Sequence, residues 1–112
     1  MYVVVQHHIR NPETAFPRGQ RLISGEGAPK GVKVLQFYPS QDQSEVTCLW
    51  ESETVALVQN WVDSTLGDSS ENVCYPVLAE QAFAERPLGL PNTPTLAGAG
   101  SAGPGLAGGS TG

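Results

Sequence analysis

One segment constrains the fold more than any other: residues 45–67, EVTCLWESETVALVQNWVDSTLG, predict a strand that runs directly into an amphipathic helix. The first seven residues alternate in character with a period of two, which is typical of a strand with two unlike faces. Ser52 then stands where a helix N-cap is expected, with Glu53 in the first turn. Apolar residues recur every three or four positions over 55–66, and Gly67 supplies a left-handed C-cap.

The same kind of pattern predicts the other elements. Further strands are expected at 2–9, 32–38 and 72–78, and one or two further helical turns at 79–85. Asn11 is placed to cap a helix that has Pro12 at its first position. Pro17 and Gly19 predict that this helix is short, kinked or split, ending near Ile23.

The element order β-α-β-β-α-β predicts an α+β, ferredoxin-like fold over residues 1–85. In this topology four strands form an antiparallel sheet whose centre holds the first and third strands. Both helices cover one face, and the other face is bare. Pro76 fits an edge position for the last strand. With about 90 ordered residues, a half-covered sheet is poorly stabilised alone, so we expect a homodimer in which a second copy covers the bare face.

Composition excludes several classes of partner. The net charge of −5 and the pI near 4.8 argue against a nucleic-acid or anionic-membrane surface. No apolar run approaches the roughly 20 residues of a membrane span, and the N-terminus has neither the basic region nor the cleavage site of a signal peptide. Two cysteines without metal-type spacing indicate a reducing compartment. We therefore expect a soluble, cytoplasmic protein.

The composition changes at Arg86. Residues 86–112 hold eight of the 13 glycines, carry no charge after Arg86 and show no hydrophobic period. Such a segment buries too little apolar surface to offset its ordering entropy, so it is predicted to be a Gly/Ala/Pro-rich flexible tail. The functional alternative is a docking peptide around Leu96 or Leu106.

The residues FYPSQDQSEVTCLWESETVALVQNWVDSTLGDSSENVCYPV, followed by LAEQAFAERPLGLP, resemble a group of small uncharacterised bacterial proteins. That group belongs to the dimeric α+β barrel superfamily, which is similar in fold to antibiotic-biosynthesis monooxygenases, muconolactone isomerases and small nickel-binding proteins. The resemblance covers roughly residues 1–90 and implies an architecture. It implies no single activity, because such folds host unrelated functions.

The candidate functional residues lie on the bare face. With the first strand beside the third, His8 shares this face with Glu45 and Thr47, and Glu71 and Asn72 are expected close by. An imidazole near carboxylates can act as a general base or as half of a metal site that the partner subunit completes.

The sequence therefore predicts a ligand site in which Gln6, Tyr38 and Thr47 accompany His8. A transition-metal ion is a candidate ligand, with His8 and Glu45 as its ligands in one subunit. The plain alternative is a solvated histidine beside a surface carboxylate.

His7 points to the opposite face, together with Val46, Cys48 and Trp50. A His–Cys pair can be a base and a nucleophile, but a core histidine beside a buried thiol is the favoured interpretation. Cys48 and Cys74 lie on strands that are not neighbours, so no disulfide is expected between them.

Two functional hypotheses follow. The first is a homodimeric binding module that encloses a small apolar ligand or a metal ion, with His8 as its polar anchor. The second is a cofactor-independent monooxygenase or isomerase for a small aromatic or polyketide-like substrate. In that enzyme His8 would abstract a proton, and Gln6 or Tyr38 would orient the substrate. A dimer with no pocket is the third possibility.

Overall fold

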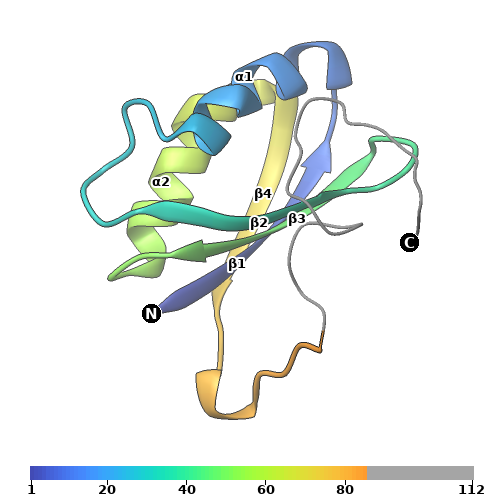
Figure 1. Cartoon of the computed structure of the whole chain (residues 1–112). Coiled ribbons are helices and arrows are strands. Elements are labelled where there is room, and N and C mark those ends of the chain that lie inside the picture. The colour runs from blue at the N-terminus through green and yellow to red at the C-terminus, as the bar shows by residue number, and fades with distance from the viewer. Residues whose placement is uncertain (86–112) are drawn as a thin grey trace. The chain divides into compact units, whose positions relative to one another are not determined.

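The computed structural model describes residues 1–85 (Figure 1). The chain divides into two units, and the fold below is that of the first, Met1–Ala82. Its elements are β1 (Tyr2–Ile9), α1 (Pro12–Ser24), β2 (Lys33–Pro39), β3 (Glu45–Glu51), α2 (Val55–Leu66) and β4 (Ser70–Pro76), with short 3₁₀ turns η1 (Gly67–Ser69) and η2 (Ala79–Gln81). The predicted order is confirmed. The predicted tail, 86–112, lies outside the described residues.

The four strands form one antiparallel sheet in the order β2-β3-β1-β4. The central pair is β1 and β3, and β4 is an edge strand that ends at Pro76, as predicted. Across β1 and β3 the register sets Gln6 opposite Thr47 and His8 opposite Glu45. The fold is the α+β, ferredoxin-like arrangement that the sequence predicts.

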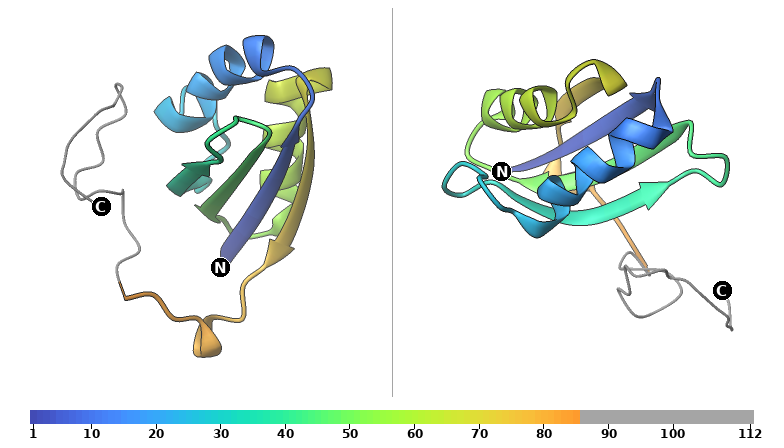
Figure 2. Two further views of the ribbon diagram at one scale, coloured as in Figure 1. Left: turned by 90° about the vertical axis from the view of Figure 1, so that its right-hand side faces the viewer. Right: turned by 90° about the horizontal axis from the view of Figure 1, so that it is seen from above.

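One face of the sheet carries the hydrophobic core. Because strand side chains alternate between faces, every second residue of β1 and β3 points toward the helices. Six of them are 0–3% exposed: Val3, Val5, His7, Val46, Cys48 and Trp50. The apolar ones pack with Leu22 of α1 and with Val58, Trp61, Val62 and Leu66 of α2. In the left view of Figure 2, α2 lies behind the sheet, so the near face of the sheet has no helix over it.

Helix α1 corrects one expectation, because it is a single helix of 13 residues that continues through Pro17. The Asn11 side chain caps it as predicted, accepting a hydrogen bond from the Glu13 backbone N–H at 3.1 Å. Pro17 is exposed, so the carbonyl that loses an intrahelical partner at this position can turn to water. Arg18 then ties the helix to the end of α2 by donating to the Leu66 carbonyl at 2.8 Å.

Helix α2 begins two residues later than expected. Its N-cap is Thr54, whose hydroxyl accepts a hydrogen bond from the Leu57 N–H at 3.1 Å. Ser52 cannot be the cap, because it is buried and its hydroxyl bonds to the backbone of Thr54. At the other end Gly67 has φ +57° and ψ −136°, which is not the predicted left-handed helical conformation, and the chain continues into η1.

None of the helices within residues 1–85 has the length and apolar character needed to cross a bilayer.

Candidate functional site

The sheet face opposite the helices, called the open face below, carries a row of hydrogen-bonded side chains across β1 and β3. The Thr47 hydroxyl lies 2.7 Å from Gln6 Oε1, and Gln6 Nε2 donates to Glu45 Oε1 at 3.1 Å. Glu45 Oε2 lies 2.7 Å from His8 Nδ1. Four of the five predicted site residues therefore form one connected network, which we call the polar row.

The polar row follows from the strand register. Gln6 and His8 are two residues apart on β1, and Thr47 and Glu45 are two apart on β3, so all four side chains point to the same face. Directly opposite residues bring their Cβ atoms within about 5 Å, close enough for the Thr47–Gln6 and His8–Glu45 contacts. Gln6 and Glu45 are diagonal neighbours, and their long side chains span the larger separation.

Glu45 is the acceptor at the centre of the polar row. The hydrogen bond from His8, and then that from Gln6, lower the pKa of its carboxyl, so Glu45 is ionised at neutral pH. His8 is the most accessible member, with 59% of its side chain exposed. Its Nε2 atom makes no hydrogen bond with residues 1–85.

Tyr38, the fifth predicted residue, lies beside the polar row on the neighbouring strand β2. It lies on β2 directly opposite Thr47, so its side chain shares the open face. It is half-buried, and burial raises the pKa of its phenol, which keeps the hydroxyl protonated at neutral pH.

Apolar side chains surround the polar row on the remainder of the open face. Val4 and Leu49 lie opposite each other in the centre of the sheet and are half-buried. On β4, Val73 and Tyr75 are 58% and 52% exposed. Side chains of this kind rarely remain this accessible in a contiguous patch unless something binds there.

Two further charges flank His8 on its other side. Glu71 of β4 lies opposite His8 and forms an ion pair with Arg10, with Nη2 and Oε1 3.5 Å apart. The predicted position of Glu71 is thus found. Asn72, the next residue of β4, also lies close by in the sheet, but it is opposite His7, and its side chain is on the face that α2 covers.

A second network, which sequence reasoning missed, lies beneath α2. His7 is 2% exposed, and its Nδ1 lies 2.7 Å from Asn72 Oδ1. Asn72 Nδ2 in turn donates to Asp63 Oδ1 at 2.9 Å. Burial is the largest influence on His7 and lowers its pKa, so the imidazole is neutral at pH 7. The sequence carries no specific signal for this network, because Asp63 and Asn72 are two among several polar residues in α2 and β4.

The cysteines do not form a nucleophilic site. Burial raises the pKa of the Cys48 thiol to about 12 and that of Cys74 to about 11, so neither is a thiolate at neutral pH. Both are free thiols, each opposite Val5 from a different side of β1.

Within residues 1–85, no three histidine, cysteine, aspartate or glutamate side chains come together in a way that could hold a metal ion. His8 and Glu45 are the nearest approach to such a site on the open face. Their hydrogen bond makes Glu45 the partner of one ring nitrogen and leaves the other ring nitrogen accessible. A single chain thus offers one imidazole ligand with a carboxylate behind it.

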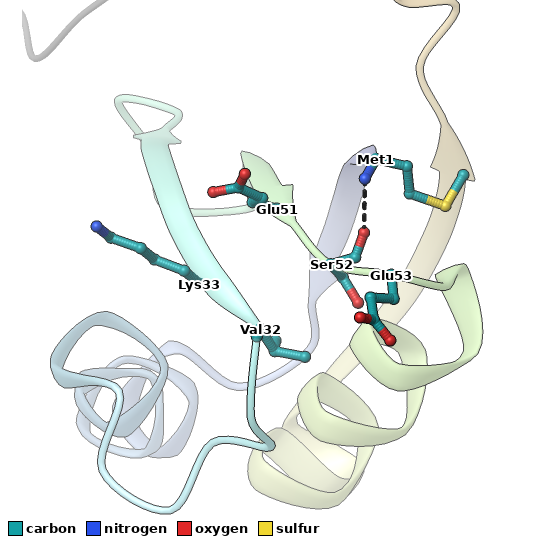
Figure 3. Close-up of a pocket in the computed structure, with 7 residues that line it drawn as sticks. Met1, Val32, Lys33, Glu51, Ser52 and Glu53 are labelled. Carbon is teal, nitrogen blue, oxygen red and sulfur yellow. Dashed lines mark hydrogen bonds between the residues drawn. The ribbon is translucent and has the colours of Figure 1, made fainter.

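A concavity elsewhere contains none of these residues. An open depression of about 440 Å³ is lined by Met1, Gly31, Val32, Lys33, Glu51, Ser52 and Glu53 (Figure 3). The terminal ammonium of Met1 donates to the Ser52 carbonyl at 2.9 Å, and the buried Ser52 hydroxyl bonds to Thr54. The buried polar groups of this depression are therefore already paired within the chain.

Comparison with known proteins adds little. No protein-family model matches the sequence, and no curated protein matches it. Among solved structures, the chain is similar to that described as "Structure of Rv0793 from Mycobacterium tuberculosis". The identity is 12%, the alignment covers 72% of this chain and 98% of the other, and the TM-score is 0.48. Function must be inferred from the open face itself.

Proposed function

We propose that the chain is a small-molecule binding module of the dimeric α+β barrel type, in which a second copy covers the open face and His8 anchors the ligand. The observation that carries this proposal is the polar row. It places one accessible imidazole, oriented by a carboxylate, at the end of β1, next to the apolar side chains on the rest of the open face. Ligand sites typically combine an apolar lining with a few well-placed polar groups.

The homodimer is the second part of the proposal. Val73 and Tyr75 on β4, and the half-buried Val4 and Leu49 beside them, form a contiguous apolar area with no helix over it. A second copy would remove this area from water, and the two polar rows would then line the enclosed space. The open face of the second copy would thereby close the side of the polar row that is exposed in a single chain.

Binding is tested with an NMR screen of small aromatic and aliphatic fragments against the full chain. Shifts should concentrate on amides of β1 and β3 that flank the polar row. His8→Ala should weaken binding by about fivefold to tenfold, the loss of roughly one hydrogen bond. The control is Arg10→Ala, which removes a charge from the same strand end and leaves the polar row intact. Shifts spread over the helices instead would contradict the proposal.

A transition-metal ion is the other candidate ligand. One chain provides the Nε2 atom of His8 as a metal ligand. Glu45 accepts a hydrogen bond from the other ring nitrogen, Nδ1, as carboxylates commonly do for metal-bound histidines. The remaining ligands would have to come from the second copy. Elemental analysis of protein purified without a histidine tag tests this directly: about one metal ion per dimer supports it, and metal-free protein that also fails to bind added Ni²⁺ or Zn²⁺ contradicts it.

A specific observation also favours an enzyme. Because Glu45 holds Nδ1 of His8, the accessible Nε2 is the atom that could accept a proton from a bound substrate. Gln6 donates to Glu45 and accepts from Thr47, so its contribution is to hold the carboxylate. Tyr38 lies on β2 opposite Thr47 and is the residue on that side of the polar row that would contact a substrate. Exchange of an acidic C–H of a bound fragment with deuterated water, abolished by His8→Ala, would support this second function.

A further inference from the structure

The polarity of each hydrogen bond in the polar row is fixed by the chemistry of its partners. Gln6 Oε1 can only accept, so the Thr47 hydroxyl is the donor. The opposite end of the same amide, Nε2, can only donate, and it faces Glu45 Oε1. A reversed amide would set two oxygen acceptors against each other at Glu45, so this orientation is the one that satisfies both neighbours.

The last link extends the same logic to the imidazole. Glu45 Oε2 lies 2.7 Å from Nδ1 of His8. An ionised carboxylate has no hydrogen, so its oxygen can only accept in this hydrogen bond. Nδ1 must therefore carry the hydrogen. In the neutral ring Nε2 is then a bare acceptor, and it belongs to the most exposed side chain of the row.

We infer that Thr47 and Gln6 are positioning residues that act through Glu45 to hold His8 in its Nδ1–H tautomer, so the open face selects ligands that bring a hydroxyl or N–H donor. This inference rests on the proposed function, in which His8 anchors the ligand. It adds the chemical class of the group that His8 recognises and the residues that set that choice.

Glu45 alone would not hold the ring in place. Its side chain is 43% exposed, and an exposed ion pair between flexible side chains gains little over water. In the polar row its two oxygens are divided between two partners, Gln6 at Oε1 and His8 at Oε2. The Thr47 hydroxyl fixes Gln6 in turn, so the carboxylate plane is restrained from both sides.

The test is nitrogen NMR of the imidazole rings in the full-length, ligand-free protein at about pH 8.5, roughly two units above the pKa of histidine in a model peptide. The shift of each ring nitrogen reports whether it carries a hydrogen. Thr47→Val removes the hydroxyl at nearly constant shape, Gln6→Leu removes the amide, and Thr47→Ser is the matched control that keeps a hydroxyl. His7 is an internal control, because its Nδ1 is held by Asn72 on the other face.

In the wild type we expect the Nε2 resonance of His8 at the unprotonated position. It should move toward the protonated position in Thr47→Val and further in Gln6→Leu, while Thr47→Ser and the His7 signals stay unchanged. A protonated Nε2 in the wild type would overturn the inference. So would an unchanged His8 signal in Gln6→Leu, which would show that Glu45 acts alone. Because no ligand is present in this experiment, either failure leaves the proposed function open to two independent tests: the fragment screen and a measurement of oligomeric state.

Discussion

His7 and His8 are neighbours in sequence, yet their side chains lie on opposite faces of β1, and this separates their roles. His7 is buried and bonded to Asn72, whereas His8 is exposed on the open face. Replacing His7 by alanine leaves a cavity under α2 and removes one of the two partners of the half-buried Asn72 Oδ1, the other being the Ser70 hydroxyl. We expect His7→Ala to lower the free energy of unfolding by about 1–3 kcal/mol, measured by chemical denaturation.

His8→Ala is the matched variant for that measurement. It changes the same residue type one position away, and it removes only an exposed pair with Glu45. The free energy of unfolding should change by less than about 0.5 kcal/mol. The reverse pattern, with His8→Ala the more damaging variant, would mean that the two faces of β1 have been assigned the wrong way round.

The residues of the polar row were predictable because strand periodicity has only two phases. Once β1 and β3 are placed side by side, parity puts Gln6, His8, Glu45 and Thr47 on one face, and the register makes His8 opposite Glu45 and Gln6 opposite Thr47. The start of β4 was also expected near His8, and there Glu71 shares the open face while Asn72 points to the opposite one. The hydrogen bond between Asn72 and Asp63 joins β4 to α2, and the periodicity of neither element predicts such a contact.

At the scale of elements, the start of α2 is set by a side chain two residues beyond the expected cap. Thr54 accepts the hydrogen bond from Leu57 N–H that would otherwise lack a partner. Thr54→Ala should therefore lower the free energy of unfolding by about 1 kcal/mol, and Thr54→Ser should retain most of it. Thermal or chemical denaturation of the two variants checks this. Equal stability of Thr54→Ala and the wild type would rule out a capping role.

The hydrogen bonds to Asp42 in the loop between β2 and β3 are expected to depend on pH. Hydrogen bonds from the Ser44 side chain and backbone, and from the Ser40 hydroxyl, lower the pKa of Asp42 to about 2. A depressed carboxyl pKa means that these bonds contribute to stability above the ordinary value near 4 and are lost as pH falls through about 2. A carbon NMR titration of the Asp42 carboxyl should show the low midpoint.

Ser44→Ala is the informative variant for that titration, because it removes the hydroxyl bond of 2.7 Å and leaves the backbone bond in place. The midpoint of Asp42 should rise toward its ordinary value. A midpoint near 4 in the wild type would show that the loop is open in solution.

The elements themselves were largely predictable from local sequence. The bounds of β1 and β3 match the expectation at both ends. β3 is an alternating run that begins and ends with glutamate, and β1 is a valine-rich run that ends just before Arg10 and the helix cap Asn11. The continuity of helix α1 was underestimated, because helix propensity predicts that a proline at position 17 interrupts the helix. The fold tolerates Pro17 because it lies on the exposed side of α1. Arg18 bonds to the end of α2, and Leu22, on the buried side, packs into the core. Tertiary contacts of this kind are not visible in a local pattern.

For the whole molecule, the main physical problem is a sheet with a core on only one side. The helix-covered face holds the buried residues of the first unit, while the open face leaves Val73 and Tyr75 more than half exposed. Burying such area gains roughly 25 cal/mol per Å². A second copy related by a two-fold axis would bring the same surface against it, and two-fold dimers are the commonest soluble oligomers.

The corresponding prediction concerns oligomeric state. We expect sedimentation equilibrium at micromolar concentration to show a dimer, and Leu49→Lys to dissociate it, since Leu49 lies in the central strand pair of the open face. An unpaired charge buried in an interface costs about 3 kcal/mol, on the order of a hundredfold in the dissociation constant. Asn60→Lys places the same charge on the exposed side of α2 and should leave the dimer intact. A wild-type monomer, or a Leu49→Lys variant that remains dimeric, would show that the open face is not the interface.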